Sequence, residues 1–340
     1  MPEPVLSVVL PNFNHARVLP KALAALTAQS RQTSEIIVVD DGSTDDSVAV
    51  VEEFAATHPN LKLLRNAKNE GVIAALSRGL AAAQGQHVYF AASDDWVLPG
   101  FFEFALAMLA KYPGAGFFCG ETVLLDGVSG AHIGTRPAVR PSHRPASFTA
   151  AETARLLRSI DNWISTGSSV FRRDAVLAAG GFDEALGSFA DGFLARKIAL
   201  THGFCYAPRR VAVWRVYPDS VSRQTAKELQ KMQDFLRIVI PRLERDPAFP
   251  PWYPRLFDQR WRFATSRLAL ERTPVDRDIL TAMSCTSKLD RHIVGLLSGS
   301  GKSRWLRILG LAWLWQKFRP YPLTGLMRTA LARRRESIPI

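Results

Sequence analysis

The chain has 340 residues, of which 47% are hydrophobic and 10% aromatic, and its formal net charge is +12. This composition excludes a disordered chain and is sufficient for one large domain or two smaller ones. The three cysteines, Cys119, Cys205 and Cys285, form no CxxC pair. That spacing argues against a disulfide framework or a structural zinc site and indicates a reducing compartment.

The positive charge is confined to one part of the chain. Residues 1–226 contain 21 basic and 21 acidic residues, so the whole excess lies in residues 227–340 and predicts an acidic partner there. The N-terminus lacks the positively charged region and long apolar run that mark a signal peptide. The apolar stretch Trp305 to Trp315 is shorter than the ~20 residues of a membrane span. We therefore predict a cytoplasmic protein, either soluble or bound peripherally to the inner face of a membrane.

Short β-branched runs alternate with helical patterns in the first hundred residues. The patterns predict strands at 5–11, 36–39, 61–66 and 88–92, and helices at 19–29, from about 46, and at 71–83. This alternation predicts an α/β fold with a mostly parallel sheet flanked by helices. Ligands of such sheets bind at the carboxyl ends of the strands, where Asp40, Asp41, Asp94 and Asp95 are expected.

The pattern is less regular beyond Pro99. It predicts a helix at 101–112, one or two strands at 115–126, a helix near 152–159 and another beginning at Asp191. Residues 127–150 are rich in Gly, Pro and Arg, which predicts a long mobile connection. The last third is predicted to be a basic, tryptophan-rich helical extension.

Four segments resemble, in order and spacing, the inverting glycosyltransferases of family 2, which have the GT-A fold. They are SVVLPNFNHARVLPKALAALTAQS, EIIVVDDGSTDDS, NEGVIAALSRGLAAAQGQHVYFAASDDWVLPGFFE and GGFDEALGSFADGFLARKIALTHG. The resemblance covers residues 5–222. It implies a nucleotide-sugar-binding half at 1–115, an acceptor-binding half with the catalytic base at 116–225, and a basic helical extension at 226–340.

The resemblance implies a binding site for a nucleotide-sugar donor, with a UDP-sugar favoured. Phe13 would stack on the base, Asp41 would accept a hydrogen bond from it, and Asp40 would lie near the ribose. Pro11 and Asn14 belong to the same Pro-x-x-Asn signature and would also contact the donor. The alternative is that Asp40 and Asp41 only shape a turn.

The resemblance also implies a Mg or Mn ion that neutralises the diphosphate of the donor. Asp94 would be the principal ligand and Asp95 would assist, with Ser93 beside the donor. The family usually has Asp-x-Asp-Asp, whereas Ala92 replaces the first acid here. The alternative is that the two acids cap the helix after Pro99.

The catalytic base implied by the resemblance is Asp191, which would take the proton of the acceptor hydroxyl. The family usually has Glu-Asp here, whereas this chain has Ala190-Asp191, and an N-cap role is the alternative. Arg215 would contact the diphosphate or pair with a surface acid. Tyr217 stands in the place of a family histidine and Leu76 in the place of a family arginine.

The resemblance thus implies a metal-assisted glycosyltransferase acting on a glycan or lipid-linked acceptor. One alternative is a turnover-deficient relative that serves as a binding subunit, and another is a nucleotidyltransferase, which the absence of a glycine-rich loop disfavours. SGSGKS at 298–303 is not a P-loop, because Leu296 stands where a glycine is needed. Residues 300–335 combine Trp, Leu and Arg and are predicted either to contact a membrane or to pack on the domain or on a second copy in a homo-oligomer. No nucleic-acid-binding module accompanies the basic charge.

Overall fold

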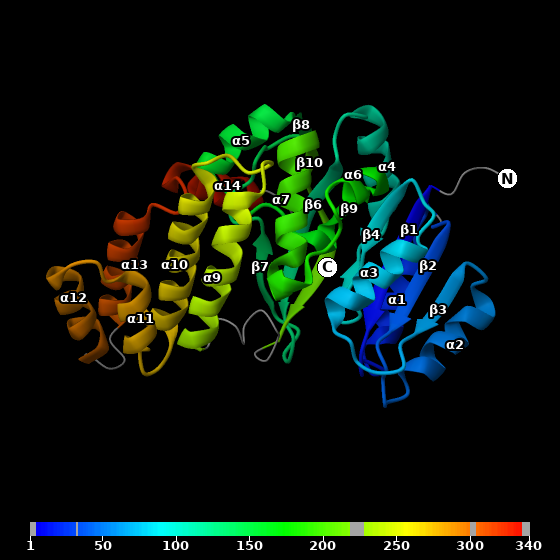
Figure 1. Ribbon diagram of the computed structural model, residues 1–340, viewed down its shortest axis with the longest axis horizontal. Coiled ribbons are helices and arrows are strands. Elements are labelled where there is room, and N and C mark those ends of the chain that lie inside the picture. The colour runs from blue at the N-terminus through cyan, green and yellow to red at the C-terminus, as the bar shows by residue number, and fades with distance from the viewer. Residues whose placement is uncertain (1–4, 32, 218–227, 300–303, 335–340) are drawn as a thin grey trace. The chain divides into compact units, whose positions relative to one another are not determined.

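The computed structural model describes residues 5–31, 33–217, 228–299 and 304–334 (Figure 1). Its described residues contain a ten-stranded sheet with the order β3-β2-β1-β4-β9-β6-β10-β5, in which β7 also pairs with β6 and β8 with β10. The strands are β1 (Leu6–Asn12), β2 (Glu35–Asp40), β3 (Leu61–Arg65), β4 (His87–Phe90), β5 (Trp96–Val97), β6 (Phe117–Asp126), β7 (His132–Arg136), β8 (Ala146–Phe148), β9 (Ser169–Arg172) and β10 (Phe204–Val216).

The sheet is mixed, with four parallel and five antiparallel strand pairs among the described residues, and the parallel pairing predicted for the first hundred residues is confirmed. Strands β3, β2, β1 and β4 pair in parallel, so that their carboxyl ends meet at one edge. Strand β9 is antiparallel to both β4 and β6, and β10 is parallel to β6. The direction reverses twice, so β6 and β10 also run with the first four strands.

Helices cover both faces of this sheet. The helices associated with it are α1 (Leu19–Thr27), α2 (Ser47–Thr57), α3 (Val72–Ala82), α4 (Phe101–Lys111), α5 (Ala150–Ser159), α6 (Arg173–Ala178) and α7 (Ala190–His202), with short 3₁₀ helices η1 (Thr166–Ser168) and η2 (Glu184–Phe189). Leu23 and Phe102 pack with Val8 and Val38 on one face. On the other face α3 approaches so closely that a Cβ on Gly79 would lie 2.3 Å from a Val9 methyl group.

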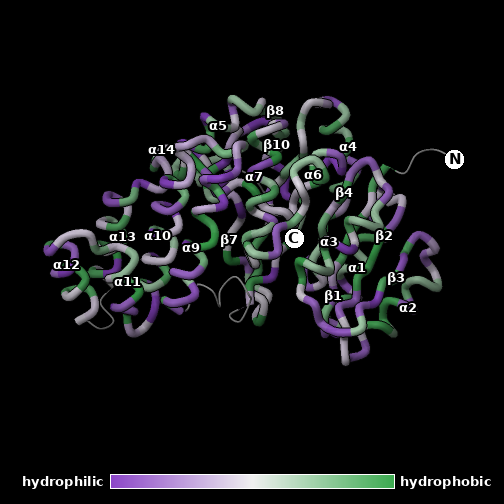
Figure 2. Tube along the Cα trace, in the orientation of Figure 1, coloured by the Kyte–Doolittle hydropathy of each residue, from purple (hydrophilic) through white to green (hydrophobic). Residues whose placement is uncertain are grey.

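The runs of apolar residues in β1 and β2 explain why the sheet is buried on both faces. Every residue of β2 is buried, and so is every residue of β1 except Pro11. Figure 2 shows the hydrophobic residues along β2. A continuous apolar run without alternation is typical of a parallel strand covered by helices on both sides.

The prediction of a mobile connection over residues 127–150 is wrong. This segment contains β7 and β8, which extend the sheet beside β6 and β10. Arg140 is buried between them in the sequence, where its guanidinium group pairs with the buried Glu121. A glycine- and proline-rich composition disfavours long regular elements but permits short strands. In this segment the buried ion pair between Arg140 and Glu121 holds the chain against the sheet.

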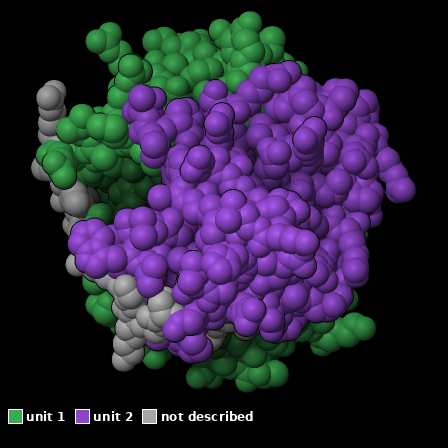
Figure 3. All heavy atoms as spheres, turned by 90° about the vertical axis from the view of Figure 1, so that its left-hand side faces the viewer, with its two compact units in different colours: residues 1–157, 161–217, 326–340 green, residues 158–160, 218–325 purple. Residues whose placement is uncertain are grey.

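The chain divides into two compact units, coloured separately in Figure 3. Unit 1 comprises Met1–Leu157, Asp161–Tyr217 and Leu326–Ile340, and unit 2 comprises Arg158–Ile160 and Pro218–Gly325. The predicted boundary at 225/226 lies outside the described residues, and the division at 115/116 stays a prediction.

Unit 2 is helical, as predicted for the extension. Beyond residue 227 the described helices are α9 (Leu229–Arg245), α10 (Tyr253–Glu271), α11 (Arg277–Ser284), α12 (Lys288–Gly299), α13 (Arg304–Phe318) and α14 (Leu323–Arg334). Met232, Leu280 and Leu314 lie at the centre of a separate apolar core within this unit. Helix α14 begins in unit 2 and continues into unit 1 from Leu326.

Candidate active site

The loop after β1 is joined to the turn after β2. Asn14 adopts a left-handed conformation with φ of 53°, which asparagine tolerates better than most residues. Its side-chain oxygen accepts a hydrogen bond of 2.8 Å from the amide of Thr44, and its own amide donates to Ser43 Oγ at 2.9 Å. Phe13 lies next to this joint with 38% of its surface exposed, so its ring is available to a ligand. Pro11 lies in the β1 register opposite Val39.

Asp40 at the end of β2 is committed to this turn. Its carboxylate accepts hydrogen bonds from the amide and hydroxyl of Ser43 at 3.0 and 2.6 Å, and from Asn12 Nδ2 at 3.0 Å. Asp40 therefore does shape the turn, as the alternative to a donor contact predicted. A contact between Asp40 and a ribose stays a prediction.

Asp41 holds the loop before α3. Oδ1 accepts from Asn66 Nδ2 at 2.6 Å and from the amide of Glu70 at 3.0 Å, while Oδ2 accepts from the amide of Gly71 at 2.8 Å. A carboxylate has about four acceptor positions, so one position on Oδ2 remains for a ligand. Gly42 must be glycine, because at φ of 75° a Cβ would lie 2.7 Å from the Lys68 carbonyl carbon.

Ser93, Asp94 and Asp95 follow β4 and lie beside the loop after β1. The Ser93 hydroxyl is hydrogen-bonded to Nδ1 of His15, a residue that sequence reasoning missed. Oδ1 of Asp95 accepts a 2.8 Å hydrogen bond from the backbone amide of Arg215. Burial first, and then the negative charge of Asp94, raise the pKa of Asp95 well above its usual value, although the Arg215 amide and charge oppose this.

The prediction that these acids might instead cap the following helix is wrong. Helix α4 has Gly100 at its N-cap, in a left-handed conformation, and its first amide, that of Phe101, donates at 3.1 Å to the side-chain oxygen of Gln29 and to neither acid. No described side chain donates a hydrogen bond to Asp94 or Asp95. Their charges are therefore not explained by local structure.

The donor set fits a Mg or Mn ion that also uses ligands from a substrate. Within the described residues no third His, Cys, Asp or Glu joins the two acids. Mg usually binds through one or two carboxylates together with phosphate oxygens and water. The raised pKa of Asp95 indicates that a second negative charge is unfavourable here without an added cation. Asp94 and Asp95 could thus hold such an ion, with the diphosphate completing its coordination.

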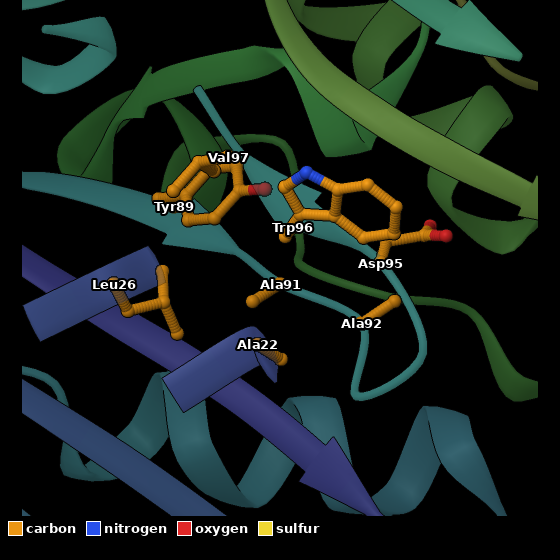
Figure 4. Close-up of a pocket in the computed structure, with 8 residues that line it drawn as sticks. All are labelled: Ala22, Leu26, Tyr89, Ala91, Ala92, Asp95, Trp96 and Val97. Atoms are coloured by element: carbon orange, nitrogen blue, oxygen red, sulfur yellow. The ribbon is translucent and has the colours of Figure 1, made fainter. Parts of the chain in front are cut away.

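A small pocket lies beside these acids (Figure 4). It is lined by Ala22, Leu26, Tyr89, Ala91, Ala92, Asp95, Trp96 and Val97. In Figure 4 the Trp96 indole lies between the Tyr89 ring and the Asp95 carboxylate. Burial, and then the charge of Asp95, raise the pKa of Tyr89 far above its usual value, so this hydroxyl stays protonated.

Asp191 is connected to the same end of β4 through η1. The Tyr89 hydroxyl donates to the Gly167 carbonyl at 3.0 Å, and the hydroxyl of the adjacent Thr166 donates to Asp191 Oδ2 at 2.7 Å. Asp191 lies in the first turn of α7, two residues after the N-cap Phe189, and its Oδ1 accepts a 2.6 Å hydrogen bond from the Gly192 amide. Asp191 is therefore not the N-cap residue, although it satisfies one amide of the first turn. Thr166, which no motif indicated, holds the carboxylate in position.

Arg215 lies near Asp95, and a second cation, Lys21, lies over the neighbouring residue Trp96. The guanidinium group of Arg215 donates to the Gly127 carbonyl at 3.2 Å and lies over the Tyr217 ring, and no described surface acid pairs with it. Lys21 lies over Trp96, with 3.3 Å from Nζ to the ring centroid. Desolvation and then the charge of Arg215 lower the pKa of Lys21. Lys21 was missed because a lysine early in a helix carries no motif.

The model of the family described as "Glycosyl transferase family 2" matches residues 7–176. An uncharacterized protein of Mycobacterium tuberculosis, MT1568, is 29% identical over 221 residues, covering 63% of this chain and 67% of that protein. The uncharacterized glycosyltransferase YibD of Escherichia coli is 36% identical over 103 residues, which are 30% of each chain. That second match spans about a third of the relative's length.

Solved structures share the fold. The crystal structure of Staphylococcus aureus TarS 1–349 in complex with UDP has a TM-score of 0.59 at 18% identity, over 93% of this chain and 91% of that one. The mannosyltransferase PcManGT of Pyrobaculum calidifontis has a TM-score of 0.57 at 20% identity, over 99% and 88%. Together with the family match over half of its length, the ordered sequence segments and the sheet that carries them, these findings establish that the chain is a glycosyltransferase and belongs to glycosyl transferase family 2.

Proposed function

We propose that this glycosyltransferase moves a sugar from a UDP-sugar to a hydroxyl group of a glycan or lipid-linked acceptor. The transfer would invert the configuration at the anomeric carbon and would be assisted by a divalent metal. The observation that supports this most is that Asp95 and Tyr89 line one pocket, and that hydrogen bonds at η1 lead from Tyr89 to Asp191. A carboxylate pair to which no described side chain donates thus lies on the same side of the sheet as a third carboxylate that is held in position.

The donor would bind over the ends of β1, β2 and β4. The exposed ring of Phe13 is suited to stack on a base, and the remaining acceptor position of Asp41 is suited to the N–H group of uracil. TarS has been crystallised with UDP and with UDP-GlcNAc, and PcManGT with GDP-Man and Mn²⁺. Those complexes support a nucleotide-diphosphate sugar, and the test below distinguishes the bases.

Asp94 and Asp95 would hold a Mg or Mn ion, and this ion would neutralise the charge that develops on the diphosphate. Arg215 and Lys21 would add positive charge beside it. Asp191 would remove the proton of the acceptor hydroxyl. That oxygen would form a bond to the anomeric carbon while the bond from this carbon to the diphosphate breaks on the opposite face, and the electron pair would leave with the nucleoside diphosphate.

The first test measures thermal stabilisation by UDP-, GDP-, dTDP- and CMP-sugars, with and without Mn²⁺. We expect UDP-sugars with Mn²⁺ to raise the Tm of the wild type and to leave the Tm of Asp94→Asn unchanged. A Mn²⁺-dependent shift with another nucleotide alone would correct the base. The absence of any Mn²⁺-dependent shift would contradict the metal-assisted proposal and favour a binding subunit.

A second test separates catalysis from binding. In Asp191→Asn we expect nucleotide release in the presence of acceptor to fall by about 10²–10⁴-fold, because general-base catalysis contributes about this much. The donor-induced Tm shift should persist, because Asp191 is not proposed to contact the nucleotide. Wild-type turnover by this variant would show that Asp191 is not the base.

A further inference from the structure

Helix α13 has an apolar stripe that its own unit does not cover. Trp305, Ile308 and Leu309 lie at helical spacing on one face, and Trp305 and Leu309 are 76% and 62% exposed. The opposite face is occupied: Leu314 is fully buried in the apolar core of unit 2, and Gly310 packs against Leu270. The helix is therefore apolar on two faces, and among the described residues of unit 2 only one of these faces is packed.

Helix α14 repeats this arrangement. Leu323, Met327 and Leu331 recur at every fourth residue and are all more than half exposed. The other face is held by the sheet of unit 1, where the Thr329 hydroxyl accepts from the Arg140 amide at 3.1 Å and Arg333 donates to Glu121 at 2.8 Å. The outward stripe of α14 is thus fixed to the unit that carries the candidate active site.

The charge around the two stripes is of a single sign. Residues 304–334 contain seven Arg or Lys residues and no Asp or Glu. Two of these cations have carboxylate partners, namely Lys317 with Asp290 and Arg333 with Glu121. Arg319, Arg328 and Arg334 are exposed, and no carboxylate in the described part of the chain pairs with them.

We infer that α13 and α14 bind the surface of a membrane rich in anionic lipids, with their apolar stripes inserted between the headgroups. Exposed Trp and Leu on one face with unpaired Arg beside them is the chemistry of an interfacial helix. The negative potential of such a surface attracts Arg and Lys side chains that lie near it. No described helix is long and apolar enough to cross a membrane, so the contact is one of helices lying along the surface.

The test is co-sedimentation of the full chain with vesicles of equal parts phosphatidylglycerol and phosphatidylcholine, or of phosphatidylcholine alone. We expect the wild type to bind only the anionic vesicles. The double variants Trp305→Ser/Leu309→Ser and Met327→Ser/Leu331→Ser should each lose at least about tenfold in partition coefficient, since interfacial burial of apolar side chains is removed. All four side chains are exposed, so the Tm should change little.

Matched controls use exposed apolar residues outside the stripes. Ile238→Ser on α9 and Leu177→Ser on α6 should bind vesicles like the wild type. Equal binding of wild type and stripe variants, or no binding by the wild type, would overturn the inference. So would a dimer in solution that the stripe variants abolish without any change in vesicle binding, because a second copy would then cover the stripes.

Discussion

Glu121 in the middle of β6 and Asp95 just after β4 are both acids of unit 1, but different groups surround them. Glu121 is fully buried, and Arg140 donates to both of its oxygens at 2.8 Å. Arg333 and Tyr206 complete its set of hydrogen bonds. Asp95 lies beside another acid, and its only described hydrogen-bond donor is a backbone amide of Arg215.

This difference separates a structural acid from one that we propose to be functional. A buried carboxylate that serves the fold is neutralised by side chains of the same chain, because an unpaired charge in the interior costs several kcal/mol. Asp94 and Asp95 are half-buried at a strand end, and burial followed by the charge of Asp94 raises the pKa of Asp95. Four substitutions test whether this distinction holds.

The largest effect is expected for Glu121→Gln. Arg140, whose side chain is 1% exposed, would remain charged without its anion, so the free energy of unfolding should fall by about 3–5 kcal/mol. Urea unfolding followed by near-UV circular dichroism measures this. Arg333→Gln is the control, because the Arg140 pair would persist and the loss should be smaller. If Glu121→Gln were as stable as the wild type, Glu121 would not be a structural acid and its contrast with Asp95 would not hold.

The next effect concerns Asp290, which joins α12 to α13 in unit 2. It accepts hydrogen bonds from Lys317 at 2.8 Å and from the amide of Thr286 at 2.9 Å. We expect Asp290→Asn to destabilise unit 2 by about 1.5–3 kcal/mol, as for other hydrogen bonds to a charged group. Thermal unfolding monitored by tryptophan fluorescence reports it.

The pH dependence of this effect has a definite sign. Burial alone would raise the pKa of Asp290, but the Lys317 contact and the Thr286 amide outweigh it and lower the pKa far below the usual 3.8. A lowered pKa means that the stabilisation is complete above pH 3.8 and is lost as the pH falls below that value. The difference between wild type and Asp290→Asn should therefore shrink on acidification, and a difference independent of pH would contradict the assignment.

Asp95→Asn should change the free energy of unfolding in the opposite direction from Glu121→Gln and Asp290→Asn. The substitution removes the repulsion from Asp94 and keeps an oxygen that can accept from the Arg215 amide. In buffer with EDTA we expect the protein to be as stable as the wild type or up to about 1 kcal/mol more stable. A clear loss of stability would make Asp95 a structural acid like Glu121.

The smallest effect is expected for Lys21→Met. The methionine keeps the contact with Trp96 but removes a charge near the proposed diphosphate site. Titration with UDP in the presence of Mn²⁺ should show a Kd about two- to fivefold higher, as for a solvent-exposed charge interaction of roughly 0.5–1 kcal/mol. Lys62→Met is the control and should leave the Kd unchanged. It removes an exposed lysine of β3 that pairs with Glu35 of β2.

Much of the first part of the sheet, strands β1 to β4, could be predicted from the sequence by itself. The runs SVVLP, EIIVVD and HVYF are short, apolar and rich in β-branched residues, and each is a buried strand. Because parallel strands end at one edge, the acids following the runs were expected to meet there. The hydrogen bonds from Asn12 to Asp40 and from His15 to Ser93 join these strand ends.

Only the tertiary structure decided how the remaining polar groups are used. Arg333 contacts Glu121 from 212 positions away, and Thr166 contacts Asp191 from 25 positions away. Such contacts depend on the register of β6, β9 and β10 and on the return of α14 to unit 1, which local periodicity does not encode. The same physics explains residues 127–150: their composition indicates a loop, but the burial of Arg140 against Glu121 makes them part of the sheet.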